Sequence, residues 1–268
     1  MKNISGLPRD VLKEEQPDRK FIEALARGLE VLRAFKPGDG FLGNQEISRR
    51  TKIPKSTVSR LTYTLTKLGY LTYSEQLEKY QLGSGVLALG YAFVSSLAIR
   101  QVAKPLMAAL AESTNTGVGL ANRDRLSMIH LEFCASTETM TFIQEIGDRV
   151  GIASSSSGRA YLAALPEQDR NYFMGLIKDR SGDDWPQIEQ GIVDAVESYE
   201  SQGFCYSWGD FNPDVIGIAV PLVLSPSNIF TFSAGGPSFR LTPEYLTNEV
   251  APLLKTMVGN IEATVIRY

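Results

Sequence analysis

Residues 45–83 constrain the fold more than any other segment of the chain. Residues 45–51 predict a short helix and 52–54 a tight turn, since Pro54 suits the first turn of a following helix. Four apolar residues then recur at spacings of three, four and three, which places them on one face of that second helix. They are Val58, Leu61, Leu65 and Leu68. Gly69 ends the helix, and residues 70–73 and 79–82 predict a two-stranded hairpin. This order predicts a winged helix-turn-helix.

The opposite face of the second helix carries side chains that are hydroxylic, slim or cationic. Such side chains can approach base edges and phosphates without holding the helix away from a DNA groove. We therefore expect a DNA interface with two kinds of contact. The residues expected to read bases are Ser56, Thr57 and Arg60. The residues expected to hold phosphates are Lys55, Ser59, Tyr63 and, on the hairpin, Lys79.

The charge distribution supports a local contact with a polyanion. Residues 20–83 contain 11 Lys and Arg against 6 Asp and Glu, a net charge of +5. The whole chain carries −3, so the remainder carries −8. A basic segment on an acidic chain indicates that this segment contacts nucleic acid locally. It does not indicate non-specific binding of nucleic acid over the whole surface.

The remaining composition indicates a cytoplasmic protein of two domains. A length of 268 residues exceeds that of a usual single domain, no apolar run is long enough for a membrane span, and no hydrophobic signal core begins the chain. Cys134 and Cys205 are expected to be reduced thiols. The single histidine, His130, disfavours His-based metal sites, and no cofactor is expected.

The pattern beyond the hairpin predicts a linker helix and then an α+β domain with an antiparallel sheet. We expect a disordered arm at 1–19, a winged helix-turn-helix domain at 20–83, a linker helix at 84–98 and a second domain at 99–268. The expected helices lie at 21–35, 84–96, 99–112, 157–165, 166–177, 188–202 and 243–266. The expected strands lie at 117–122, 127–133, 139–146, 204–207, 216–224 and 229–234. The apolar surface of the linker helix needs a partner, which a second copy of the chain would supply.

Over residues 20–268 the chain resembles the IclR family of bacterial transcriptional regulators. Residues 24–32 are similar to the family's opening helix, 53–61 to its recognition helix, and 68–71 and 80–83 to its wing. Later segments at 157–163, 218–221 and 236–242 match further landmarks of the family in the expected order. The resemblance implies a GAF-like effector-binding domain, a homodimer or dimer of dimers, and transcription controlled by a small metabolite.

Several positions depart from the family pattern. Ser207 and Trp208 stand where the family often has two acids, and Asp210 stands where a Glu is usual. Gly217 replaces a frequent Cys, and of two late serines one fits Ser233 while the other position holds Gly235. With Tyr206, Trp208 and Phe211 the site gains aromatic surface, which disfavours small acids such as glyoxylate.

The segment Ser154, Ser155, Ser156 and Ser157 precedes a predicted helix. Serines and unpaired N–H groups at a helix N-terminus favour an anion, so a carboxylate is the expected guest. Trp208 and Phe211 would cover an apolar body, since ligand pockets are mostly apolar. The expected effector is therefore an organic acid, and an aromatic one fits this surface. The expected effector-binding residues are Ser154, Ser155, Ser156, Ser207, Trp208, Phe211, Gly217, Ser233 and Gly235.

Two other functions remain open at this stage. An enzyme would use Cys134, Cys205 or the serine segment as nucleophile and His130 as base, but no Gly-x-Ser-x-Gly elbow or phosphate loop is present. His130 lies in an apolar strand and is expected to be a structural residue with satisfied hydrogen bonds. A sensor module would use the helix-turn-helix only for protein contacts. The mechanism we expect is allosteric: a dimer places two recognition helices about 34 Å apart, and the effector biases their pose through the linker helix.

Overall fold

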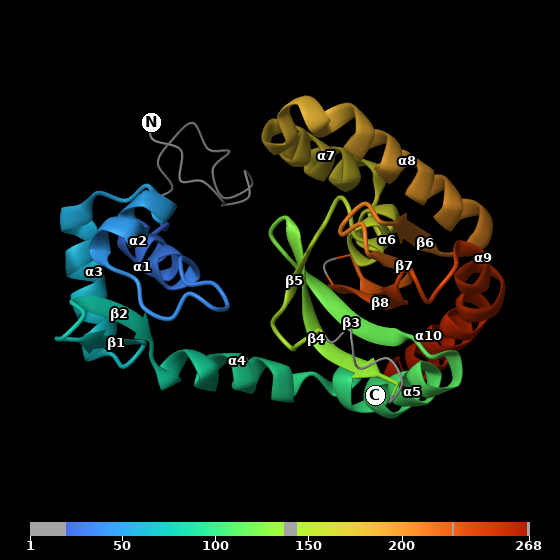
Figure 1. Cartoon of the computed structure of the whole chain (residues 1–268), viewed down its shortest axis with the longest axis horizontal. Coiled ribbons are helices and arrows are strands. Elements are labelled where there is room, and N and C mark those ends of the chain that lie inside the picture. Colours follow the sequence, from blue (N-terminus) through green and yellow to red (C-terminus); the bar gives the residue numbers. More distant parts are fainter. Residues whose placement is uncertain (1–19, 137–143, 227, 267–268) are drawn as a thin grey trace. The chain divides into compact units, whose positions relative to one another are not determined.

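The computed structural model describes residues 20–136, 144–226 and 228–266. The arm expected at 1–19 and most of the strand expected at 139–146 lie outside these described residues. The chain forms two compact units, Met1–Ser96 and Leu97–Tyr268, each with its own core. The fold is α+β, with a helix-turn-helix in the first unit and an antiparallel sheet in the second (Figure 1).

The first unit is a winged helix-turn-helix, as the sequence predicts. It contains α1 (Glu23–Arg33), α2 (Asn44–Thr51), α3 (Lys55–Lys67) and a hairpin of β1 (Leu71–Ser74) and β2 (Lys79–Leu82). Its core is formed by apolar residues from all of these elements, among them Val31, Ile47, Val58 and Leu71. Gly69 adopts φ +78° after α3 and turns the chain into the hairpin.

Two polar side chains join the helices of this unit. Thr62 is fully buried in α3, and its hydroxyl lies 3.3 Å from the Asn44 side-chain oxygen and 3.0 Å from the Val58 carbonyl. Arg50 donates to the Ala34 carbonyl and pairs with both Asp39 and Glu46, which ties α2 to the end of α1. Leu68, expected in the apolar stripe, is instead 64% exposed, because α3 ends at Lys67 and the chain leaves the helix there.

Helix α4 (Ser84–Ser96) follows the hairpin and has no buried residue. Its large apolar side chains face outward, with Leu87 74% and Tyr91 71% exposed. No single helix in the described ranges is both long and apolar enough to cross a membrane; α4 and α5 (Ala98–Thr114) meet that criterion only as a pair interrupted at Leu97.

The second unit is built on a six-stranded antiparallel sheet in the order β5-β4-β3-β8-β7-β6. The strands are β3 (Gly117–Asp124), β4 (Ser127–Ala135), β5 (Arg149–Gly151), β6 (Cys205–Trp208), β7 (Val215–Ser225) and β8 (Asn228–Pro237). The third strand expected from the sequence is wrong at its described end, since residues 144–146 form no strand and the short β5 begins at Arg149.

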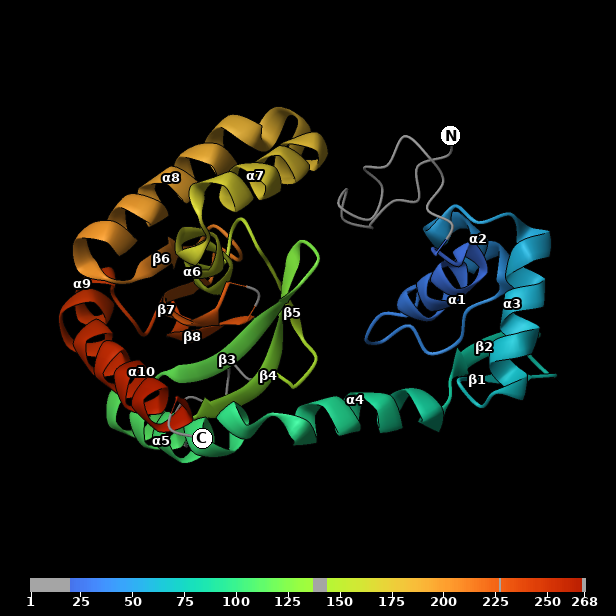
Figure 2. The same ribbon diagram turned by 180° about the vertical axis from the view of Figure 1, so that it is seen from behind.

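Helices cover both faces of this sheet (Figures 1 and 2). On one face α5 and α10 (Ala251–Val265) pack around Met107, Leu131, Phe232 and Leu254. On the other lie α6 (Ser156–Ala164), α7 (Glu167–Ser181) and α8 (Trp185–Gln202), with a 3-10 turn (Gly182–Asp184) between the last two. The sheet is therefore buried on both sides, which explains its long apolar runs.

A bulge in β4 changes which face its side chains point to. Glu132 pairs with Leu120 and His130 with Ala121, so Leu131 has no partner on β3. Glu132 is buried against α5, where its carboxylate lies 2.8 Å from the Arg100 guanidinium and 3.3 Å from the Lys104 ammonium. His130 faces away from α5, as described below.

The closing helix expected at 243–266 is broken. A short α9 (Pro243–Tyr245) and a π-helical turn (Leu246–Val250) precede α10. Pro252 lies in the first turn of α10, where the N–H that proline lacks would have no helical partner. The π turn absorbs the change of register between the two helical segments.

Helix α6 packs closely against the chain that precedes it. A Cβ atom at Gly158 would collide with the backbone of Ile152, whereas one at Gly175 in α7 would meet nothing within 4 Å. The same Gly→Ala change should therefore have opposite effects at these two helical positions. We expect Gly158→Ala to destabilise the second unit by about 2 kcal/mol through overpacking. Gly175→Ala should stabilise it by about 0.5 kcal/mol through helix propensity.

Guanidinium unfolding of the full chain, followed by tryptophan fluorescence, measures this difference. Both tryptophans, Trp185 and Trp208, lie in the second unit, so the signal reports on that unit alone. A Gly158→Ala variant as stable as the parent would show that α6 can move away from Ile152 without cost.

Candidate functional sites

The exposed face of α3 carries most of the side chains that the sequence singled out for DNA. Lys55, Ser56, Ser59, Arg60 and Tyr63 are all exposed on this helix. Thr57 is only partly exposed and lies at the margin of the face, toward α1. Lys67, one turn after Tyr63, completes the face, with its ammonium 5.5 Å from the centre of the Tyr63 ring. The sequence analysis missed Lys67 because it stands at the end of the helix, beside the apolar residue that closes the pattern.

A shallow hollow joins the start of α3 to the hairpin. Lys55 and Lys79 both line it, together with Gln45 and Arg49 of α2. Arg49 is held by two hydrogen bonds to Glu46, of 2.6 and 2.8 Å. Hydrogen bonds from Arg49 and then from Arg50 lower the pKa of Glu46 to about 2, so this carboxylate stays charged at neutral pH. The free cationic side chains of the hollow are thus those of the two lysines.

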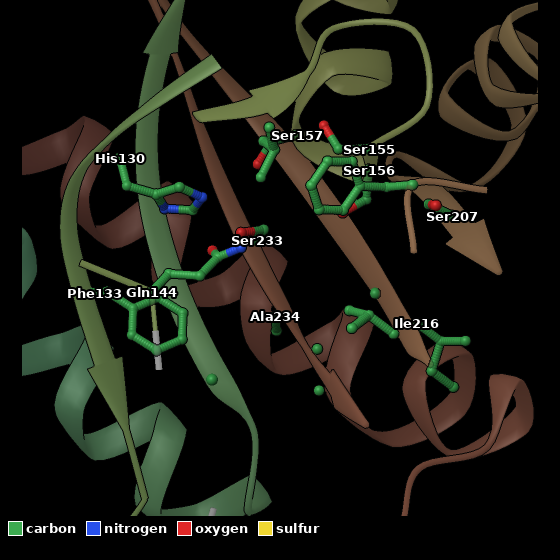
Figure 3. Close-up of a pocket in the computed structure, with 17 residues that line it drawn as sticks. His130, Phe133, Gln144, Ser155, Ser156, Ser157, Ser207, Ile216, Ser233 and Ala234 are labelled. Atoms are coloured by element: carbon green, nitrogen blue, oxygen red, sulfur yellow. The ribbon is translucent and has the colours of Figure 1, made fainter. Parts of the chain in front are cut away.

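The second unit contains a cavity where the first turn of α6 meets the sheet. Its empty volume is about 490 Å³, part of it open to solvent. Seven of the nine expected effector-binding residues line it, as Figure 3 shows for several of them. They are Ser155, Ser156, Ser207, Phe211, Gly217, Ser233 and Gly235. The predicted site is therefore brought together in space from α6, β6, β7, β8 and the loop that follows β6.

Two expected residues do not line the cavity. Trp208 is adjacent to Ser207 on β6, and neighbouring strand residues point to opposite faces. It stacks on Tyr206 with ring centres 4.9 Å apart and packs against the core beside α10. Ser154 contributes its carbonyl, which accepts a 2.8 Å hydrogen bond from the Ser207 hydroxyl. Trp208 therefore does not line this cavity, unlike Phe211, the other aromatic residue expected there.

The first turn of α6 is built by one of the serines. The Ser155 hydroxyl accepts from the Gly158 N–H at 3.0 Å and donates to the Gly151 carbonyl at 2.7 Å, so it caps the helix. Ser156 and Ser157 then begin the helix and line the cavity. The positive end of the helix dipole is directed at this part of the cavity, which favours a bound anion.

His130, Phe133 and Gln144 also line the cavity and were missed by the sequence analysis. His130 is buried, and its Nδ1 atom has no hydrogen-bond partner among the described residues, so the expectation of a satisfied structural histidine is wrong. Burial lowers its pKa to about 4, although Asp148 raises it in part, and the ring is neutral at pH 7. The glycines of β3 could have indicated this cavity from the sequence, because a strand position without a side chain leaves space above it.

Glycines form much of the floor of the cavity. A Cβ atom at Gly119 would lie 3.0 Å from both His130 Nδ1 and the Ser233 hydroxyl, and one at Gly217 would lie 3.4 Å from the Ser156 hydroxyl. These three polar atoms therefore approach the sheet only because the strands beneath them lack side chains at these positions.

An ion pair holds the rim of the cavity. The Arg159 guanidinium is 4% exposed and donates to Asp210 at 2.9 Å and to the Tyr206 carbonyl at 3.0 Å. The same Asp210 oxygen accepts from the Trp208 N–H at 3.1 Å. Arg159 of α6 is thereby tied to the segment that carries Phe211, so Asp210 has a structural partner on the protein itself.

Among the described residues, the lining of the cavity contains no Lys, Arg, Asp or Glu. Neither cysteine lines it, and burial raises the pKa of both thiols, that of Cys205 to about 12. The described parts of the chain contain no group of three His, Cys, Asp or Glu residues placed to hold a metal. This arrangement can bind a small, partly polar molecule, but it offers no activated nucleophile.

Comparisons with known proteins identify the two domains of the chain. The IclR helix-turn-helix domain matches residues 24–75, and the C-terminal domain of bacterial transcriptional regulators of the IclR type matches residues 91–263. The regulator TsaQ1/TsaQ2 of Comamonas testosteroni is 34% identical over 90% of this chain and 88% of its own. A crystal structure of an IclR-family regulator from Brucella abortus is 47% identical, with a TM-score of 0.88, over 94% of this chain and 95% of its own.

A third relative shares the fold. The structure of an IclR homologue from Microbacterium hydrocarbonoxydans, in complex with 4-hydroxybenzoate, has a TM-score of 0.70 at 24% identity, over 91% of this chain and 100% of its own. Neither matching domain description names a catalytic activity, and the relatives are transcriptional regulators rather than enzymes. The chain therefore belongs to the IclR family of bacterial transcriptional regulators, and its first unit is the DNA-binding domain.

Proposed function

We propose that this protein is a sequence-specific regulator whose DNA binding is controlled by an aromatic monocarboxylic acid. The observation that carries the effector assignment is the uncharged cavity at the first turn of α6. Membership of this family implies a DNA partner and a small-molecule effector. We assign the residues that bind each of them from their positions in the structure.

At the DNA, α3 enters the major groove with its exposed face toward the bases. Ser56 and Arg60 lie on this face and are assigned to base edges, with Thr57 at its margin. Lys55 and Lys79 line one hollow between α3 and the hairpin, so both are assigned to the phosphate backbone, together with Ser59 and Tyr63. Arg60 has the geometry for a bidentate contact with guanine.

Replacing Arg60 with alanine should reduce discrimination between sequences as well as affinity. We expect a loss of about tenfold or more on DNA from the protein's own promoter region, against a much smaller loss on a scrambled duplex, because a base contact contributes about 1–3 kcal/mol of discrimination. Fluorescence anisotropy at fixed salt measures both affinities.

Lys178→Ala is the matched control, since it removes one exposed positive charge from α7 of the other unit. If Arg60→Ala loses affinity equally for the two duplexes, Arg60 contacts a phosphate and not a base. Salt dependence of parental binding separates DNA recognition from a purely protein-binding role, because each phosphate contact releases counterions.

For the effector, the polar and apolar parts of the cavity fit an aromatic acid. The carboxylate is placed at the first turn of α6, near Ser156, where the helix dipole favours an anion. The ring is placed among Phe133, Phe211 and Ile216. The 4-hydroxybenzoate complex of the Microbacterium homologue supports a ligand of this class.

Introducing a negative charge at the first turn of α6 should abolish this binding without unfolding the helix. We expect Ser156→Asp to lower the affinity for an aromatic acid at least tenfold, because the two carboxylates repel each other. The helix should stay folded, because its dipole favours a carboxylate at the N-terminus. Isothermal titration calorimetry with benzoate and hydroxybenzoates measures the affinity.

Ser154→Asp adds the same charge two residues earlier, where the side chain does not line the cavity. Its effect should be clearly smaller. If Ser156→Asp binds the acids as tightly as the parent, the carboxylate does not sit at α6.

Self-association is the third part of the proposal. Helix α4 exposes Leu87, Tyr91 and Phe93, and α1 exposes Leu25 and Leu29. Apolar surface of this extent favours a second copy of the chain. A dimer would present two α3 helices to successive major grooves.

Leu87→Glu should weaken this association, because burying an unpaired carboxylate is costly. Sedimentation velocity is expected to show a dimer or larger species for the parent and a shift toward monomer for the variant. Phe239→Glu, at a position 77% exposed in the second unit, is the control. A monomeric parent at micromolar concentration would rule out the proposed dimer.

A further inference from the structure

Two polar atoms in the effector cavity have no hydrogen-bond partner in the described parts of the chain. His130 Nδ1 and the Ser157 hydroxyl oxygen are both buried without a hydrogen bond among the described residues, and each side chain is 2% exposed. A buried polar group without a hydrogen bond is destabilising, so such a group indicates that a partner is missing. Both residues line the same cavity, which indicates that a ligand supplies that partner.

The two atoms belong to different walls. Ser157 comes from the first turn of α6, and His130 comes from β4; Ser233 of β8 is drawn below both of them in Figure 3. Phe133 and Gln144 lie on the His130 side of the view. A ligand that reaches both walls can satisfy the two atoms with two separate polar groups.

The electrostatics of the cavity decide which groups these are. The α6 turn favours one anionic group, but the described residues of the lining include no cationic side chain to neutralise a second one. His130 is neutral at pH 7 because burial lowers its pKa. A neutral imidazole has one donor and one acceptor nitrogen, and a hydroxyl group can bond to either tautomer. A hydroxyl is therefore the group that fits Nδ1.

We infer that His130 is a specificity-determining residue that hydrogen bonds a hydroxyl group of the effector, while Ser157 donates to its carboxylate. The ligand class is then the hydroxylated aromatic monocarboxylates, as opposed to unsubstituted or dicarboxylic acids. This inference rests on the proposed aromatic-acid effector and narrows it.

Calorimetry of the full chain with benzoate, the three hydroxybenzoate isomers and terephthalate tests it. The parent should bind one hydroxybenzoate at least tenfold more tightly than benzoate and terephthalate. His130→Leu should reduce that preference to about twofold or less while leaving benzoate affinity within about threefold, because only the hydroxyl loses its partner.

Two amide variants locate the contact on the ring. The amide of His130→Asn lies near the position of Nδ1 and should restore part of the preference, whereas that of His130→Gln lies near Nε2 and should not. Cys134→Ser, on the same strand but outside the cavity lining, should behave as the parent. Tryptophan fluorescence establishes that each variant is folded.

The outcomes separate this inference from the function on which it rests. The role of His130 would be overturned if His130→Leu kept the preference for the hydroxybenzoate over benzoate. It would also be overturned if all folded His130 variants lost affinity equally for both acids. Either result would leave the aromatic-acid effector intact. If none of the acids binds the parent, the aromatic-acid effector itself is wrong and the inference fails with it, whereas promoter binding would still establish the DNA-binding role.

Discussion

The close approach of α6 to the central sheet is the constraint on which the second unit depends. Two glycines allow it: Gly217 of β7 lies beneath the Ser156 hydroxyl, and Gly158 lets α6 lie against the Ile152 backbone that precedes it. Because side chains are absent there, the positive end of a helix reaches the middle of a buried sheet. The cavity is the space that remains beside this contact, and Arg159 and Asp210 fix its rim from α6.

Local patterns predicted the first unit well because its signals are short in range. A 3.6-residue period, a proline at one end of α3 and a glycine at the other define that helix without reference to the rest of the chain. The prediction was wrong at the end of the helix, where Leu68 leaves the core. The apolar pattern also could not reveal Thr62, which is buried through hydrogen bonds. The exposed face of α3 agrees with the residues chosen for DNA, and their individual contacts stay predictions.

In the second unit, the order of elements could be predicted but the direction of single side chains could not. Ser207 and Trp208 are neighbours in the sequence, yet strand alternation sends one into the cavity and the other into the core beside α10. His130 resembled a core residue because its neighbours in the strand are apolar, and its ring has room only because Gly119 on the adjacent strand lacks a side chain. Pairing between distant strands decides such cases, and a single sequence does not contain it.

The bulge at Leu131 gives β4 two separate polar contacts within three residues. His130 forms a wall of the cavity, while Glu132 lies on the reverse side in an ionic contact with Arg100 and Lys104. If a ligand in the cavity shifts the backbone of β4, the ionic contact of Glu132 with the two cations of α5 shifts with it. Since α5 begins at Ala98, directly after the division between the units, Glu132 ties the strand that lines the cavity to the helix with which the second unit begins.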